Sequence, residues 1–131
     1  MEGSLKLKEV SYIHSESYAA GELKHGTISL IDEDVPVIAV ATQTGIIPKT
    51  ISNVVEVKSR GANVILVCTD ACARELKDGV ADYVIEIPHT DELLMPITAV
   101  VPLQILAYYT SINRGIDPDK PKNLAKSVTV E

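Results

Sequence analysis

The chain has 131 residues, 46% of them hydrophobic and 23% charged, and a formal net charge of −6. This length is enough for one domain with a real core and too short for two ordinary ones. The acidic balance and the lack of a basic run exclude the electrostatic footprint of a nucleic-acid-binding protein.

Membrane and secreted classes are also disfavoured. No apolar run approaches the roughly 18 residues of a membrane span, and no signal peptide opens the chain. We therefore predict a cytoplasmic protein that does not bind membranes.

The opening stretch, residues 4–26, is predicted to begin as a helix that carries charges among apolar residues. At about 100° per residue, one arc is assigned to solvent: Ser4, Lys8, Ser11 and Ser15. Another arc, interleaved with apolar residues, holds Glu2, Lys6, Glu9 and Glu16. Charges within an apolar face must be paired or lie in a wet pocket, because burying them alone is costly. Two interpretations stay open, a pocket wall and a surface helix with ion pairs.

Beyond this helix, strands and helices alternate. Gly21 and Gly26 interrupt the helical pattern and predict a bend or a short second helix. A helical turn or short strand follows at residues 27–34. Runs of β-branched apolar residues predict three strands, over 35–42, 62–68 and 82–87. Helical spacing and glycine or proline boundaries predict two helices between the strands, over 49–60 and 72–77.

The last helix is predicted over residues 91–113, with Thr90 as its N-cap. Pro96 and Pro102 should kink it or split it in two. Because the helix is apolar nearly all round, we expect it to be buried against the sheet or in a subunit interface. Residues 117–131 are polar and lack a helical stripe, which is typical of a frayed tail.

Alternating strands and helices predict a parallel α/β sheet with helices around it. The core must be built from Val, Ile, Leu and Ala, since Phe and Trp are absent, and this composition suits a buried parallel sheet. Three strands are few for this class, and a helix precedes the first strand. We therefore expect an incomplete sheet from a larger fold.

The two cysteines, Cys68 and Cys72, lie four residues apart without a second pair or a clustered histidine. A zinc site would need more ligands than these. We interpret them as reduced structural thiols.

Three side chains have the chemistry of a catalytic site, and each also has an ordinary explanation. Glu9 could act as an acid or base or be paired with Lys6. His25 could act at a site or simply end a helix. Lys126 could form a Schiff base or be a solvated tail lysine. From the residue pattern alone, we can predict only a soluble α/β domain.

Three strings extend the interpretation: SLKLKEVSYIHSESYAAGELKHG, VPLQILAYY and PKNLAKSVTVE. They resemble the C-terminal part of the glutamine–fructose-6-phosphate aminotransferases, from near residue 2 to Glu131. The resemblance implies a sugar isomerase (SIS) fold, a three-layer α/β arrangement with a parallel sheet flanked by helices. Residues 1–115 would form a second SIS subdomain without its first strand or strands, and residues 116–131 an active-site tail.

The resemblance also implies roles for single residues. Lys126 would form a Schiff base with the ketose carbonyl of fructose 6-phosphate. Glu9 would move a proton between C1 and C2, and His25 would promote ring opening, reaching the site of a neighbouring subunit. The implied substrate-binding residues are Glu2, Lys6 and Ala125.

The implied partners are a sugar phosphate and a second copy of the chain, with no metal or organic cofactor. The glutaminase half and the serine- and threonine-rich loop that holds the phosphate are expected outside this chain, which should therefore be inactive alone. Two alternatives stay open. One is a non-catalytic SIS-type sensor of phosphosugars. The other is an oligomerisation piece whose apolar surface at residues 95–107 pairs with another copy.

Overall fold

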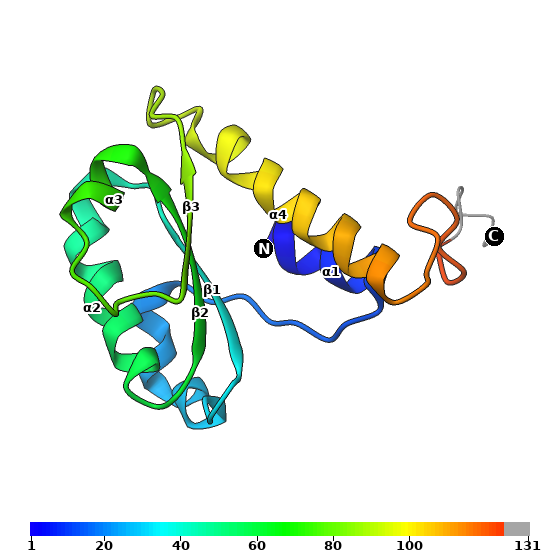
Figure 1. The fold of residues 1–131 in the computed structure, drawn as a ribbon, viewed down its shortest axis with the longest axis horizontal. Helices are drawn as coiled ribbons and strands as arrows, with labels where there is room; N and C mark the ends of the chain where they lie inside the picture. Colours follow the sequence, from blue (N-terminus) through cyan, green and yellow to red (C-terminus); the bar gives the residue numbers. More distant parts are fainter. Residues whose placement is uncertain (125–131) are drawn as a thin grey trace. The chain divides into compact units, whose positions relative to one another are not determined.

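Figure 1 shows the computed structural model of the chain, which describes residues 1–124. Its elements are α1 (Glu2–Ser11), η1 (Ala20–His25), η2 (Thr27–Leu30), β1 (Pro36–Ala41), η3 (Thr44–Ile46), α2 (Ile47–Lys58), β2 (Asn63–Thr69), α3 (Asp70–Glu75), β3 (Tyr83–Ile87) and α4 (Met95–Asn113), where η marks 3₁₀ turns. The chain forms two compact units. One spans Tyr18–Pro102, and the other combines Met1–Ser17 with the chain from Leu103 onwards.

The sheet lies in the Tyr18–Pro102 unit and has the order β1-β2-β3 with all strands parallel. Val37 is in register with Val64, and Leu66 with Val84. The central strand β2 is buried along almost its whole length, as expected when helices cover a parallel sheet. The predicted parallel α/β fold is confirmed, and each strand lies within two residues of its prediction.

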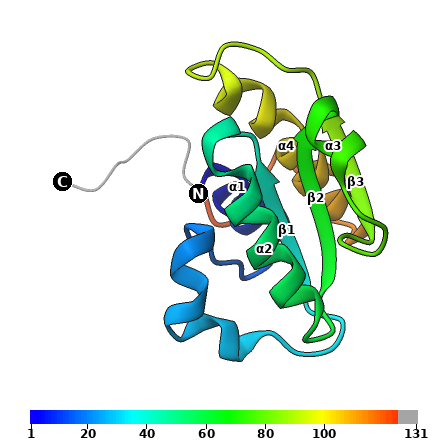
Figure 2. The same ribbon diagram turned by 90° about the vertical axis from the view of Figure 1, so that its left-hand side faces the viewer.

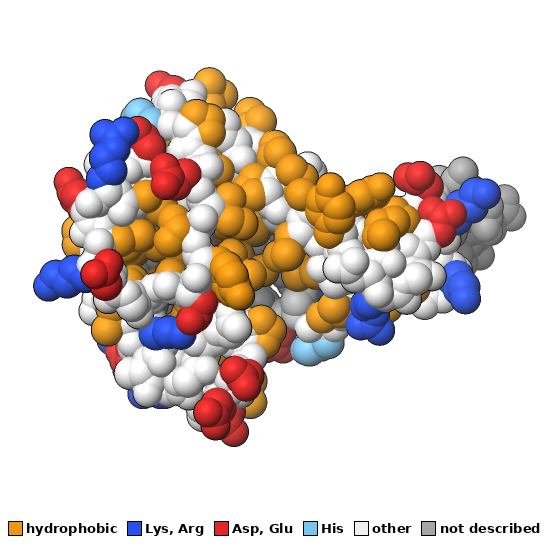
Figure 3. Space-filling view, in the orientation of Figure 1, with side chains coloured by type: hydrophobic (Ala, Val, Ile, Leu, Met, Phe, Trp, Pro, Cys, Tyr) orange, Lys and Arg blue, Asp and Glu red, His pale blue; other side chains and the backbone are white. Residues whose placement is uncertain are grey.

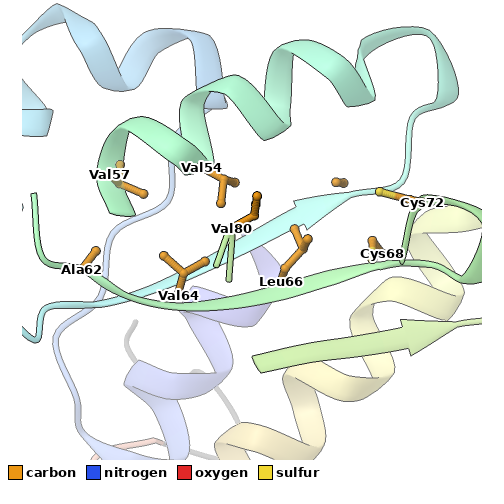
Figure 4. Close-up of a cluster of buried hydrophobic side chains, with 9 residues drawn as sticks. Val54, Val57, Ala62, Val64, Leu66, Cys68, Cys72 and Val80 are labelled. Carbon is orange, nitrogen blue, oxygen red and sulfur yellow. The ribbon is translucent and has the colours of Figure 1, made fainter. Parts of the chain in front are cut away.

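Helix α2 covers one face of this sheet, with η1 beside it (Figure 2). Pro48 lies in the first turn of α2, where its missing N–H costs nothing. Val54 and Val57 then point at the sheet and pack with Val64 and Leu66 of β2 (Figure 4). This cluster is the main core of the unit.

Helix α3 begins two residues earlier than predicted. Thr69, the last residue of β2, is its N-cap, and the Thr69 hydroxyl accepts a hydrogen bond from the Cys72 N–H over 3.4 Å. The strand therefore passes into the helix without a loop. This connection places Cys68 and Cys72 side by side in the core, both reduced and buried.

Burial and the neighbouring Cys72 raise the pKa of the Cys68 thiol to about 12. In the unfolded chain a thiol ionises near pH 8.5. Between about pH 8.5 and 12 the unfolded state alone gains the charge, so we expect the free energy of unfolding to fall as pH rises through this window. Urea titrations of wild type and Cys68→Ala at several pH values test this. Because burial also raises the pKa of Cys72, the variant should keep a fall, but a smaller one than wild type. Equal pH profiles would contradict it.

Helix α4 begins at Met95, so the predicted start at residue 91 and the Thr90 N-cap are wrong. Asp91 instead makes a turn: its side chain accepts from the Leu93 N–H and its carbonyl from the Met95 N–H, at 2.9 and 3.0 Å. The predicted split is also absent, since Pro102 lies inside one continuous helix.

The predictions drawn from the apolar character of α4 are only partly correct. At 19 residues the helix is long and apolar enough to cross a membrane by length and composition, so the expectation that no run approaches this length was wrong. A core helix of a soluble protein passes the same test. One side of α4 is buried, whereas apolar side chains gather on another side, which is exposed (Figure 3). The exposed residues include Ile97, Val101, Ile105, Tyr109 and Ile112. The prediction that α4 is buried therefore holds for one side of the helix only.

The second unit pairs α1 with the C-terminal part of α4. Gly3 is buried against Leu103, and a Cβ at Gly3 would come within 2.7 Å of Leu103 Cδ1. The predicted solvent arc is wrong at Ser11, which is fully buried and donates to the Leu7 carbonyl over 2.6 Å. A serine that bonds its own helix backbone can be buried without leaving a polar group unsatisfied.

Candidate functional site

The α1 charge cluster, defined as Glu2, Lys6 and Glu9, forms as the helical spacing predicted. Lys6 makes an ion pair with Glu9 and lies 3.6 Å from the Glu2 carboxylate. The side chains of Lys6 and Glu9 are 32% and 23% exposed. The ion-pair interpretation is confirmed, and the cluster stays within reach of solvent.

Lys6 and Glu9 of this cluster are suited to different chemical roles. The hydrogen bond that Lys6 donates to Glu9, together with the negative charges of Glu9 and Glu2, holds the pKa of Lys6 above its usual value. A protonated lysine is no nucleophile, so Lys6 is suited to supplying charge and not to forming an imine. Glu9 is an oriented carboxylate that keeps solvent access, as a proton-transfer group requires.

His25 lies in the Tyr18–Pro102 unit as the last residue of η1, just before Gly26. It is exposed, and its Nδ1 lies 3.0 Å from the Glu22 carboxylate. The neighbouring Lys24 makes an ion pair with Glu56 of α2, which holds the pKa of that carboxyl below its usual value. The prediction that His25 ends a helical segment is confirmed.

Lys126 and Ala125 lie outside the described residues. The described chain that leads to them makes hydrogen bonds up to Lys122. The Asp117 side chain accepts from the Asp119 N–H over 2.9 Å. The Lys122 N–H then donates to the Tyr12 hydroxyl over 2.6 Å.

Sequence reasoning missed Tyr12 and Ser111. Ser111 is fully buried, and its hydroxyl lies 2.8 Å from the Val10 carbonyl and 3.0 Å from the Ile116 carbonyl. Both side chains contact segments that lie about a hundred residues away in the sequence. No local sequence pattern predicts contacts of this kind.

One concave feature of the described residues lies away from Glu2, Lys6, Glu9 and His25. A shallow cavity of about 260 Å³ lies between α3 and β3, lined in part by Leu76, Lys77, Val84 and Glu86. Among residues 1–124, no group of three or more His, Cys, Asp or Glu side chains is arranged to hold a metal ion.

Comparison with known proteins gives a consistent family assignment. The family model described as SIS domain matches residues 1–114. Glutamine–fructose-6-phosphate aminotransferase [isomerizing] of Clostridium perfringens is 59% identical over all 131 residues, which cover 22% of that protein. The chain thus spans about a fifth of the length of the curated relatives it matches.

Two solved structures share the fold. The C-terminal domain of glucosamine-fructose-6-phosphate aminotransferase from Francisella tularensis is 39% identical with a TM-score of 0.82, over 88% of this chain and 32% of that chain. Glucosamine-6-phosphate deaminase from Thermotoga maritima is 30% identical with a TM-score of 0.68, over 96% of this chain and 35% of that chain. The predicted SIS-type fold is confirmed.

Proposed function

The chain belongs to the SIS domain family, and we propose that it is part of the isomerase region of a glutamine–fructose-6-phosphate aminotransferase. The observation that carries this proposal is the 59% identity, along all 131 residues, to a protein of that name. The activity would be conversion of fructose 6-phosphate and glutamine to glucosamine 6-phosphate. Residues 1–115 would belong to a SIS subdomain and residues 116–131 to an active-site tail.

The proposed chemistry uses two groups of this chain in turn. The Lys126 amine attacks the C2 carbonyl of open-chain fructose 6-phosphate, and loss of water leaves a protonated imine. Ammonia, which glutamine supplies outside this chain, then adds at C2 and displaces the Lys126 amine, which leaves the imine of fructose 6-phosphate. Glu9 takes a proton from C1 of that imine and returns it at C2, and this converts the ketose imine into the 2-amino aldose, glucosamine 6-phosphate. A carboxylate that serves adjacent carbons must be oriented, and the ion pair with Lys6 supports that role.

The remaining residues support the reaction without forming bonds to the sugar. Lys6 supplies positive charge beside Glu9, while Glu2 and Ala125 line the substrate site. His25, exposed on η1, promotes ring opening and does so in the site of a neighbouring subunit. We propose a homodimer on this basis. The exposed apolar side of α4 also favours association. A cytoplasmic location fits the metabolic role of the relatives' named activity.

Borohydride trapping tests this proposal. The complete natural protein is mixed with fructose 6-phosphate and reduced, because borohydride converts an imine into a stable secondary amine. Peptide mass mapping should find the reduced sugar phosphate on Lys126, and the adduct should be lost completely in Lys126→Arg.

The matched control is Lys120→Arg, a neighbouring lysine of the same tail, which should keep the adduct. An adduct on Lys6 or Lys120, or none in a folded sample, would contradict the proposed role of Lys126. Absence of any adduct would favour a non-catalytic sugar-phosphate-binding module.

A further inference from the structure

Tyr12 has a backbone conformation that its residue type disfavours. It is the C-cap of α1 and has φ 55° and ψ 28°, in the left-handed region. Glycine or asparagine is the usual choice at such a cap, because a Cβ is crowded there. Strained backbone of this kind points to a function for the side chain that is kept there.

The contact made by the Tyr12 side chain supplies that function. Its hydroxyl accepts the Lys122 N–H over 2.6 Å, across 110 positions of sequence. Neither glycine nor asparagine could make this contact, since neither carries a group that extends so far from the backbone. The strained cap and the long-range hydrogen bond therefore have one explanation.

A second polar contact holds the start of the same tail. Gly115, at φ 69°, lies two residues after the end of α4. The buried Ser111 hydroxyl contacts the carbonyls of Ile116 and Val10. Ile116 is thereby tied to the C-terminal end of α1. The tail between Ile116 and Lys122 is held at both ends, first by Ser111 and then by Tyr12.

The geometry of an extended chain limits how far Lys126 can lie from Lys122, the residue that Tyr12 contacts. Four residues separate Lys122 from Lys126, and an extended chain covers at most about 3.6 Å per residue, so their Cα atoms are no more than about 14 Å apart. Tyr12 itself follows Glu9 by three residues, about one helical turn. The Tyr12 hydroxyl thus joins the tail segment before Lys126 to α1, the helix that carries Glu9.

We propose that Tyr12 is a positioning residue that anchors the tail at Lys122, four positions before Lys126, and so speeds imine formation at that lysine; this inference rests on the proposed function. Its hydroxyl acts through the Lys122 amide and does not touch substrate. Without this anchor, the contact between Ser111 and Ile116, ten positions before Lys126, is the one that the described residues still make from α4 to the tail. The run of chain between the contact and Lys126 is then longer, and imine formation becomes slower.

The test compares wild type with Tyr12→Phe in the complete natural protein. Hydrogen exchange should show a slowed Lys122 amide in wild type that exchanges faster in the variant. Borohydride trapping with fructose 6-phosphate should show a five- to tenfold slower adduct formation on Lys126, about the factor that one neutral hydrogen bond corresponds to. The melting temperature should change little, because the ring that packs is retained.

Tyr83→Phe is the matched control, since Tyr83 is exposed on β3, in the other unit. It should leave both readouts at wild-type values. An unprotected Lys122 amide in wild type, or trapping at the wild-type rate in Tyr12→Phe, would overturn the positioning role. A wild-type protein that forms no Lys126 adduct would instead overturn the proposed function, while the exchange measurement would still report on the anchor.

Discussion

Glu9→Gln is expected to lower the turnover of fructose 6-phosphate to glucosamine 6-phosphate by about a thousandfold, the middle of the range for a lost general acid–base group. A carboxamide keeps an acceptor for Lys6 and hence the side-chain geometry, but it cannot take a proton from carbon. The pKa of Lys6 should fall, because its largest raising cause is the Glu9 hydrogen bond.

The measurement is deuterium incorporation at C1 and C2 of the sugar phosphate in D₂O, with trapping of Lys126 in parallel. Glu9→Gln should lose the proton transfer and keep the adduct, which separates the two proposed steps. Glu92→Gln is the matched control, since Glu92 is exposed and lies before α4. Wild-type deuterium incorporation in Glu9→Gln would show that another group moves the proton.

The fold could be predicted from the sequence where local pattern and tertiary burial agree. The run NVILVCT of β2 is apolar and β-branched, and it is buried as a central strand. Helix α2 was likewise predicted from its apolar spacing, within two residues. The start of α4 was missed because Asp91 caps a turn and not the helix itself. Only side-chain geometry separates these two roles of an aspartate.

The burial of single polar residues was harder to predict than the elements. Ser11 was assigned to solvent because serine is polar, yet its hydroxyl bonds the Leu7 carbonyl and the side chain is buried. Ser4 of the same arc is half-buried and exchanges hydrogen bonds with Ser15. A serine hydroxyl that donates a hydrogen bond to a backbone carbonyl no longer needs water as a partner.

Part of the candidate site could be predicted from the sequence, and part could not. The helical period alone grouped Glu2, Lys6 and Glu9, and the structure brings them together. The contribution of Tyr12 depends on a contact with Lys122, 110 positions away, and on a positive φ that nothing in the sequence around it demands. Long-range anchors of this kind require the tertiary structure.

Gly3→Ala is expected to destabilise the α1–α4 contact and to lower the proposed activity by on the order of a hundredfold, the cost of about 1 Å of misplacement at a reacting group. In most helices this change stabilises by about 0.5–1 kcal/mol. Here the new Cβ would lie 2.7 Å from Leu103 Cδ1 and 2.9 Å from Leu103 Cβ. Overpacking costs about 1–3 kcal/mol, so the clash outweighs the gain.

Because the Leu103 Cβ belongs to the base of its side chain, a rotamer change cannot remove the whole clash, and α1 must shift with Glu9 on it. Gly21→Ala is the matched control, since a Cβ there meets nothing within 4 Å, and it should leave both stability and activity near wild type. Urea unfolding and deuterium incorporation at C1 measure the two effects. If Gly3→Ala proved as stable and as active as wild type, close packing at Gly3 would not be what fixes the position of Glu9.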